Sequence, residues 1–227
     1  MRFGAQPGSL TAPIASGKRN RWAHGRLIRA VILMLTGVSA MGVGAAEPAR
    51  YPDVVPGNEL RFPEDEGSHP RHRIEWWYVT GLLDHDQPQP LGFQVTFFRV
   101  RTGLGESNPS RFAPRQILFE HAAVADPRAG RLRHAQRAAR AGFDLAYART
   151  DVLDVRLDDW FLARGDGGYT TAVSGEDFSF ELRFEPTRPP LLHGDAGYSR
   201  KGQDPLAASY YYSLPQLAAR GKVSIQG

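Results

Sequence analysis

Short segments in which apolar and polar residues alternate follow one another from residue 74 onward. In one of them Phe93, Val95 and Phe97 fall on one face of an extended chain, because successive side chains of a strand point to opposite sides. Turns rich in Gly, Pro and Asp separate the segments. This pattern predicts an antiparallel, all-β barrel or sandwich. Its strands are expected in residues 74–83, 91–101, 116–126, 151–164, 169–186, 208–217 and 221–227.

Residues 131–149 are the one segment whose composition favours a helix. The stretch is rich in Ala and Arg, but its five arginines leave no clean apolar stripe for a helix to bury. Helix and strand both remain open for this segment.

The first 46 residues have the order of regions that is typical of an export signal. Basic residues up to Arg29 precede 17 uncharged residues that end in small side chains. We expect cleavage near Ala46 and a mature protein that is periplasmic or secreted. An uncleaved anchor is disfavoured because this length is the lower limit for a spanning helix, and Gly and Ser dilute its end.

The excess of basic residues over acidic residues comes from these first 46 residues. The chain has 28 basic and 24 acidic residues, a net charge of +4. Residues 1–46 contain six of the basic residues and no acidic one, so 22 basic residues face 24 acidic ones in the remainder, a net charge of −2. A nucleic-acid partner is therefore not expected. The chain has no cysteine, so the fold has no disulfide and depends on its core.

Residues 47–70 are rich in Pro and charged side chains and are expected to form an irregular lead-in to a domain of residues 71–227. Their junction reads "HPRHRIEWWYVTG", residues 69–81, and places three large aromatic residues directly after Glu75. A strand with aromatic residues at adjacent positions fills space on both of its faces. Such a strand is either structural on both sides or lines a binding site on one.

The role of Glu75 depends on which face of this strand points inward. With the odd-numbered face inward, Glu75 and Trp77 share an apolar cavity. Burial there raises the pKa of a carboxyl, which keeps a proton to donate near neutral pH, and ring faces stabilise a cation. With the even-numbered face inward, Trp76 and Tyr78 line the cavity. Glu75 then pairs with an arginine such as Arg99, which lowers the pKa of the carboxyl.

Several other chemistries lack their sequence motifs. The histidines at 69, 72, 85, 121 and 193 show no His-Glu-x-x-His or comparable spacing, so we expect no metal site and no cofactor. The segment "GYSRKG", residues 197–202, lacks the Gly-x-Ser-x-Gly pattern of a serine hydrolase. A glycine-rich phosphate-binding loop is also missing.

Seven motifs, in order along residues 50–227, resemble the AttH-type, lipocalin-like family of exported bacterial proteins. They are "HPRHRIEWWYVTG", "GFQVTFFR", "QILFEHAAVADP", "RAARAGFDLA", "LDDWFL", "LLHGDAGYSRKG" and "ASYYYSLPQL". The family is related to the carotenoid 1,2-hydratases (hydroxyneurosporene synthases), and its members contain two lipocalin-like barrels in tandem. The resemblance implies that this chain holds the first calycin-type barrel. The second barrel, an intramolecular partner, is expected to be absent from it.

The resemblance also implies an exported protein that binds isoprenoid- or carotenoid-like lipids and hydrates a carbon–carbon double bond. Glu75 is the candidate acid in this barrel, while the residues usually favoured for hydratase chemistry lie in the second one. The alternative is a non-catalytic periplasmic lipid-binding module that serves an ABC-type permease. The hydrophobic ligand is expected to contact Trp76, Trp77, Tyr78, Phe97, His121, Tyr198 and Tyr211.

Overall fold

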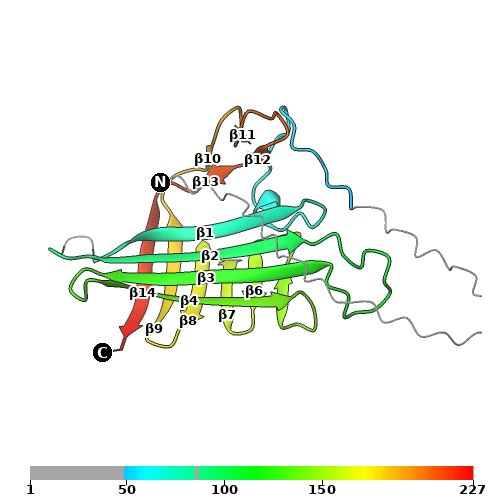
Figure 1. Cartoon of the computed structure of the whole chain (residues 1–227). Helices are drawn as coiled ribbons and strands as arrows, with labels where there is room; N and C mark the ends of the chain where they lie inside the picture. Colours follow the sequence, from blue (N-terminus) through cyan, green and yellow to red (C-terminus); the bar gives the residue numbers. More distant parts are fainter. Residues whose placement is uncertain (1–48, 85–86, 227) are drawn as a thin grey trace, which may run out of the picture. The chain divides into compact units, whose positions relative to one another are not determined.

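The computed structural model describes residues 49–84 and 87–226, in which nearly all of the regular secondary structure is antiparallel β-strand. The first four strands make one sheet in chain order (Figure 1). These strands are β1 (Ile74–Leu83), β2 (Leu91–Arg101), β3 (Gln116–Asp126) and β4 (Arg131–Arg140). The first three coincide with segments predicted from the alternating pattern. The prediction of an antiparallel all-β fold is confirmed.

Six strands in the order β14-β9-β8-β7-β6-β5 make the second large sheet. Their bounds are β5 (Ala146–Ala148), β6 (Asp154–Leu157), β7 (Trp160–Gly165), β8 (Gly168–Ser174), β9 (Phe178–Pro186) and β14 (Leu217–Ile225). The predicted segments 151–164 and 169–186 each contain two strands and a tight turn. In the first turn Asp158 has a φ of 59°, a left-handed conformation that Asp tolerates better than most residues.

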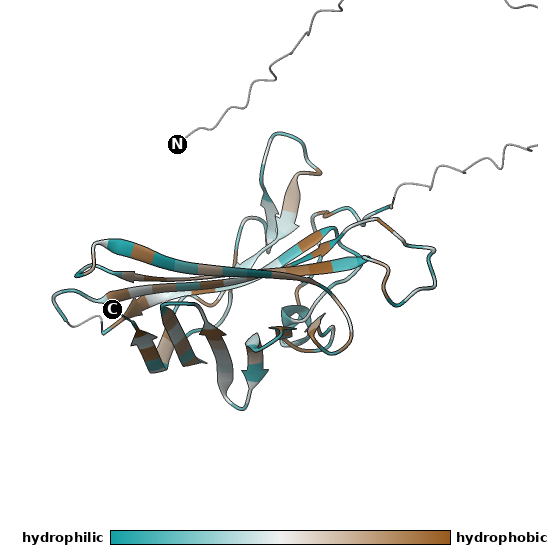
Figure 2. Cartoon of the chain, turned by 60° about the horizontal axis from the view of Figure 1, so that its bottom comes forward, coloured by the Kyte–Doolittle hydropathy of each residue, from teal (hydrophilic) through white to brown (hydrophobic). Residues whose placement is uncertain are grey.

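The two large sheets face each other across one apolar core. The ring of Phe93 on β2 lies 6.0 Å from that of Phe180 and 5.9 Å from that of Phe184, both on β9. The strands of the two sheets cross steeply in Figure 1, as in orthogonal sheet packing. Figure 2 shows the alternation of apolar and polar residues along these strands. The core side chains are at most 6% exposed, and several of them, including Leu162 and Phe184, also border the pocket beside β1.

Residues 131–149, for which helix and strand both remained open, form strand β4 and the short strand β5. β4 pairs with β3 from Asp126↔Arg131 to Ile117↔Arg140. Inward and outward residues alternate along it, with Arg133 buried and Leu132 and His134 exposed. Backbone hydrogen bonds along the antiparallel pairing with β3 hold β4 in the extended conformation. This pairing outweighs the small helix preference of Ala and Arg.

The shorter elements lie outside the two large sheets. Two small two-stranded sheets, β10 with β13 and β11 with β12, lie close to β1 in Figure 1. Their bounds are β10 (Leu191–Leu192), β11 (Tyr198–Arg200), β12 (Ala208–Tyr210) and β13 (Tyr212–Ser213). The lead-in contains one 3-10 helix, η1 (Glu64–Glu66). The expected export signal lies outside the described residues. Within the described part of the chain, no helix has the length and apolar character needed to cross a membrane.

Candidate functional site

A pocket of about 900 Å³ lies beside strand β1. Its walls come mainly from the lead-in between residues 54 and 72, from β1, and from residues 209–217. β1 is the edge strand of its sheet, so both of its faces border the pocket. Trp77 packs against the core on the inner face, whereas Trp76 and Tyr78 lie on the outer face. The adjacent aromatic residues of the motif therefore line the same pocket from two sides of one strand.

Aromatic side chains form a continuous part of the pocket wall. Six of them come from β1 and from the run "SYYYS": Trp76, Trp77, Tyr78, Tyr210, Tyr211 and Tyr212. The hydroxyl of Tyr210 both accepts a hydrogen bond from the amide of Val55 (3.1 Å) and donates one to its carbonyl (3.2 Å). The ring of Tyr212 meets that of Phe62 edge to face at 4.7 Å. These contacts fix the tyrosine run against the lead-in.

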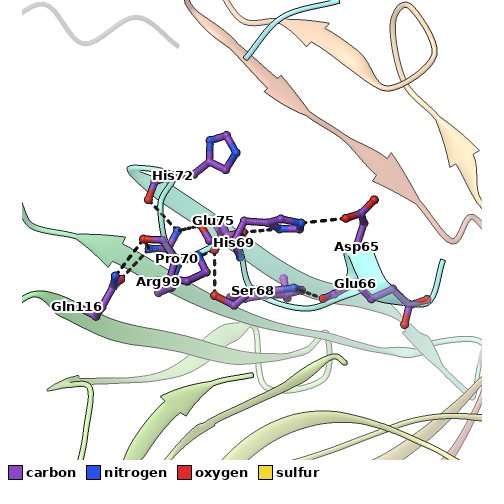
Figure 3. Close-up of polar contacts among 10 residues, drawn as sticks. Asp65, Glu66, Ser68, His69, Pro70, His72, Glu75, Arg99 and Gln116 are labelled. Carbon is purple, nitrogen blue, oxygen red and sulfur yellow. Dashed lines mark hydrogen bonds and ion pairs between the residues drawn. The ribbon is translucent and has the colours of Figure 1, made fainter. Parts of the chain in front are cut away.

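A buried arginine organises the polar end of the pocket (Figure 3). The side chain of Arg99 on β2 is 2% exposed, and its Nε donates to Glu75 Oε2 at 2.6 Å. Its terminal nitrogens donate to the carbonyl oxygens of His69 (3.1 Å) and His72 (2.9 Å) and to Gln116 Oε1 (2.7 Å). One guanidinium thus holds the turn of residues 69–72 against two strands.

His69 lies between two carboxylates. Its Nδ1 is 2.9 Å from Glu75 Oε1, its Nε2 is 3.0 Å from Asp65 Oδ1, and its backbone amide donates to Glu75 at 2.6 Å. The hydrogen bond to Glu75 raises the pKa of His69 to about 9, against the opposing effect of burial. Burial alone would raise the pKa of Glu75, but the hydrogen bond from His69 and the charge of Arg99 outweigh it and lower that pKa. Both side chains are therefore charged at neutral pH.

The arrangement at Glu75 combines the two interpretations drawn from the sequence. The odd-numbered face of β1 points inward, as the acid role requires. Arg99 also lies directly opposite Glu75 in the register of β1 and β2, so the ion pair of the second interpretation forms on that same face. Glu75 consequently holds no proton at neutral pH, and its geometry favours the structural role over that of an acid.

Trp77 has a structural contact of its own. Its indole Nε1–H donates to the carbonyl oxygen of Glu66 in η1 at 2.8 Å. The Glu66 side chain is 3% exposed and accepts hydrogen bonds from Arg164 on β7 (2.7 Å) and from the hydroxyl of Tyr169 on β8 (2.8 Å). Glu66 thereby connects the lead-in to the six-stranded sheet. Of the two adjacent tryptophans, Trp77 is hydrogen-bonded to Glu66 in the lead-in. The ring of Trp76 lines the pocket from the outer face of β1.

Four of the residues predicted to contact a ligand line this pocket, namely Trp76, Trp77, Tyr78 and Tyr211. The other three lie elsewhere. Phe97 is fully buried in the core between the sheets. His121 is exposed on the outer face of β3, 5.7 Å from the ring of Phe98. Tyr198 lies in a hairpin and donates its hydroxyl hydrogen to the carbonyl of Pro205 at 2.8 Å. A ligand in the pocket would not contact these three side chains.

Several pocket residues were not predicted. Asp65 and Leu60 belong to a lead-in without any repeating pattern, so nothing in the sequence indicates that it returns to β1. Tyr210 and Tyr212 flank the predicted Tyr211, and the run of three tyrosines was the available signal. Across residues 49–84 and 87–226, no group of three or more His, Asp or Glu side chains is placed to hold a metal ion.

Comparisons with known proteins agree with this fold. The profile of the AttH-like family matches residues 53–227. The crystal structure of an AttH protein (NE1406) from Nitrosomonas europaea is 51% identical, with a TM-score of 0.69 over 78% of this chain and 53% of that one. Kievitone hydratase from Nectria haematococca has a TM-score of 0.51 over 79% of this chain and 49% of its own, at 10% identity, a likeness of fold alone.

The search among curated proteins found no match. The chain spans about half the length of the two solved structures. Antiparallel sheets of the AttH and lipocalin-like type form the fold, as the motifs in the sequence indicated. With the family profile extending over most of its length, the chain belongs to the AttH-like family.

Proposed function

We propose that the pocket beside β1 binds a hydrophobic small molecule of the isoprenoid class. The observation that carries this proposal is the aromatic wall formed by β1 and the tyrosine run. Ligand pockets combine an apolar or aromatic lining with a few placed polar groups, and their volumes are roughly 300–1,000 Å³. The pocket has both properties, and flat rings suit the branched, flexible chain of an isoprenoid.

The charges at the polar end support an uncharged ligand. The two carboxylates, Asp65 and Glu75, are both in contact with the protonated His69, and Glu75 is also paired with Arg99. These four charges balance, and none of them is left to attract a ligand of opposite charge. A nucleotide or another phosphate ester would find no dedicated partner among these four groups. A neutral isoprenoid alcohol fits the arrangement better.

Binding of tritiated geranylgeraniol, measured by equilibrium dialysis, tests this proposal. Trp76→Ala removes the largest ring on the outer face of β1 and is expected to weaken binding by about tenfold or more, because the contact area of the indole is lost. Phe119→Ala is the matched control, since Phe119 on β3 stacks on Phe98, is not a register partner of β1 and does not line the pocket. Its affinity is expected within about twofold of the wild type. Equal losses in both variants would contradict the assignment of the ligand to this pocket.

We also propose that the protein is exported, on the basis of the basic and apolar regions that precede Ala46. Expression of the whole chain in a bacterial host is expected to give a periplasmic product whose amino-terminal sequence starts at Ala46 or Glu47. Leu33→Arg places a charge in the apolar region and should keep the protein in the cytoplasm at full length. Recovery of uncleaved wild-type protein from the membrane fraction would refute the proposal.

A further inference from the structure

Four large apolar side chains lie exposed at one end of the four-stranded sheet. The loop from β2 to β3 and the segment that follows β4 both leave the sheet at this end, at the right of Figure 1, because β3 begins beside the ends of β2 and β4. The four side chains are Leu104 (63% exposed), Phe112 (65%), Phe143 (39%) and Leu145 (62%). Exposed apolar residues that gather in one place mark a binding surface more often than those scattered singly.

Two of these side chains pack on each other across the two segments. The ring centroids of Phe112 and Phe143 are 4.9 Å apart. Phe143 has a φ of 61° and Asp144 a φ of 58°, left-handed conformations that a bulky residue such as Phe rarely adopts. The backbone therefore keeps an aromatic ring at the surface in a turn where Gly or Asn would be less strained. The two segments together form one aromatic surface.

Two arginines lie against these rings. The guanidinium carbon of Arg111 is 5.1 Å from the centroid of the Phe143 ring, and that of Arg140 is 5.2 Å from the centroid of Phe112 and 5.7 Å from that of Phe143. Among residues 49–84 and 87–226, no carboxylate forms an ion pair with either arginine. Both positive charges contact ring faces instead of acids, and they are left to attract an external anion.

The net charge of this surface is opposite in sign to that of the domain that carries it. Residues 101–115 and 140–145 contain four arginines and two acidic residues, a net charge of +2, whereas residues 47–227 together have a net charge of −2. One of the two acids, Glu106, is paired with Arg101 at 2.8 Å. The charge distribution therefore directs this end of the sheet toward an anionic partner.

We propose that this surface docks the protein on an anionic lipid bilayer. Leu104, Phe112 and Leu145 enter the boundary between headgroups and acyl chains, where Phe and Leu are preferred side chains. Arg111 and Arg140 lie beside them and bind the lipid phosphates, to which a planar guanidinium can donate two hydrogen bonds. A nucleic acid would pair with the arginines but leave the leucines in water. Such docking goes beyond the ligand binding proposed for the pocket beside β1 and does not require it.

A fluorescent label at Leu145 tests this contact. Leu145→Cys introduces a single thiol, because the chain has no cysteine of its own. After labelling with acrylodan, the emission of the whole chain should shift to the blue when vesicles of phosphatidylcholine and phosphatidylglycerol are added, because the label leaves water. Vesicles of phosphatidylcholine alone, or high salt, should remove most of the shift. Glu181→Cys, at an exposed position on β9, carries the same label as a control and should show no shift.

Vesicle titrations of two further substitutions in the labelled chain separate the apolar contribution from the electrostatic one. Phe112→Ser should weaken the apparent affinity about tenfold, because its ring is no longer transferred from water. Arg111→Gln should weaken it about fivefold through the loss of one charge near the membrane. Leu206→Ser, 59% exposed in the loop between β11 and β12, and Arg183→Gln on β9 are the matched controls and should stay within about twofold.

Three results would overturn the proposal. The first is an unshifted emission from the label of Leu145→Cys while the protein sediments with the vesicles, which would place the attachment in another part of the chain. The second is an equal shift with neutral and anionic vesicles, because the arginines would then have no role. The third is a shift that needs no lipid and grows with protein concentration, which would identify the surface as a contact between copies of this chain.

Discussion

Replacing Arg99 with methionine is expected to lower the free energy of unfolding by about 3–5 kcal/mol. The guanidinium is buried, and its removal leaves the Glu75 carboxylate without its arginine partner. That carboxylate is only 14% exposed and would then be paired with His69 alone among its two ion-pair partners. The carbonyl oxygens of His69 and His72 lose their hydrogen bonds at the same time. Methionine keeps most of the apolar volume, so the loss reports on charge and hydrogen bonding more than on packing. Urea unfolding followed by tryptophan fluorescence measures it.

Two further variants make this experiment specific. Arg183→Met removes an arginine that is 46% exposed and paired with Glu185 at the surface, and it should cost less than about 1 kcal/mol. Adding Glu75→Gln to Arg99→Met removes the stranded charge and should recover part of the lost stability. If Arg99→Met were no more destabilising than Arg183→Met, Arg99 would not be the organising residue of the lead-in.

The second large effect concerns Glu120, whose carboxyl lies in the core on the inner face of β3. The residue is fully buried, and neither of its carboxyl oxygens has a hydrogen-bond partner among the described residues. In the strand register it lies beside Phe97 of β2 and Arg137 of β4. Burial raises its pKa to about 9, with Arg137 opposing and Asp159 adding to the shift. Glu120 is therefore protonated in the folded protein at neutral pH.

This raised pKa makes stability depend on pH. Between its ordinary pKa near 4.5 and the folded value of about 9, the folded state holds a proton on Glu120 that the unfolded state has released. The contribution of Glu120 is therefore fully present below pH 4.5 and falls by about 1.4 kcal/mol per pH unit as pH rises through this window. The protonated His69 adds a smaller fall over pH 6.5–9, because its pKa is also raised and the side chain is 42% exposed.

Glu120→Gln isolates the effect of Glu120 from that of His69. The variant should be close to the wild type in stability near pH 4.5 and increasingly more stable as pH rises, by roughly 2–4 kcal/mol at pH 7. Thermal or urea unfolding of both proteins at each pH gives the difference directly. Glu181→Gln, at an exposed position on β9, should show no such trend. A constant difference between Glu120→Gln and wild type from pH 5 to 8 would mean that Glu120 is ionised in the folded state.

The long strands could be predicted from the sequence because each buries one face and exposes the other. Their alternating residues identify β1, β2 and β3 with the observed bounds. The strand β4 could not be assigned, because its buried face carries Arg133 beside alanines and thus lacks the apolar residues that usually mark a strand. The hairpin turns at Asp158 and between β8 and β9 were not assigned, although the buried positions change from odd-numbered to even-numbered residues across each of them.

The candidate site was predicted less completely, for a physical reason. Alternation along β1 cannot show that β1 is an edge strand, and only an edge strand lets Trp76 and Trp77 border one pocket from opposite faces. The pairing of Glu75 with Arg99 depends on the register of β1 and β2, which in turn depends on the loop between them. The approach of the lead-in and the tyrosine run to β1 depends on single contacts such as that of Tyr210 with Val55.

The central claim is that an isoprenoid binds beside β1, and a crystal structure of the chain grown with geranylgeraniol tests it most directly. We predict electron density for the ligand along β1, in contact with Trp76 and Tyr212. Density on the outer face of the four-stranded sheet, against Phe98 and Phe119, or a pocket without ligand at saturating concentration, would contradict the account.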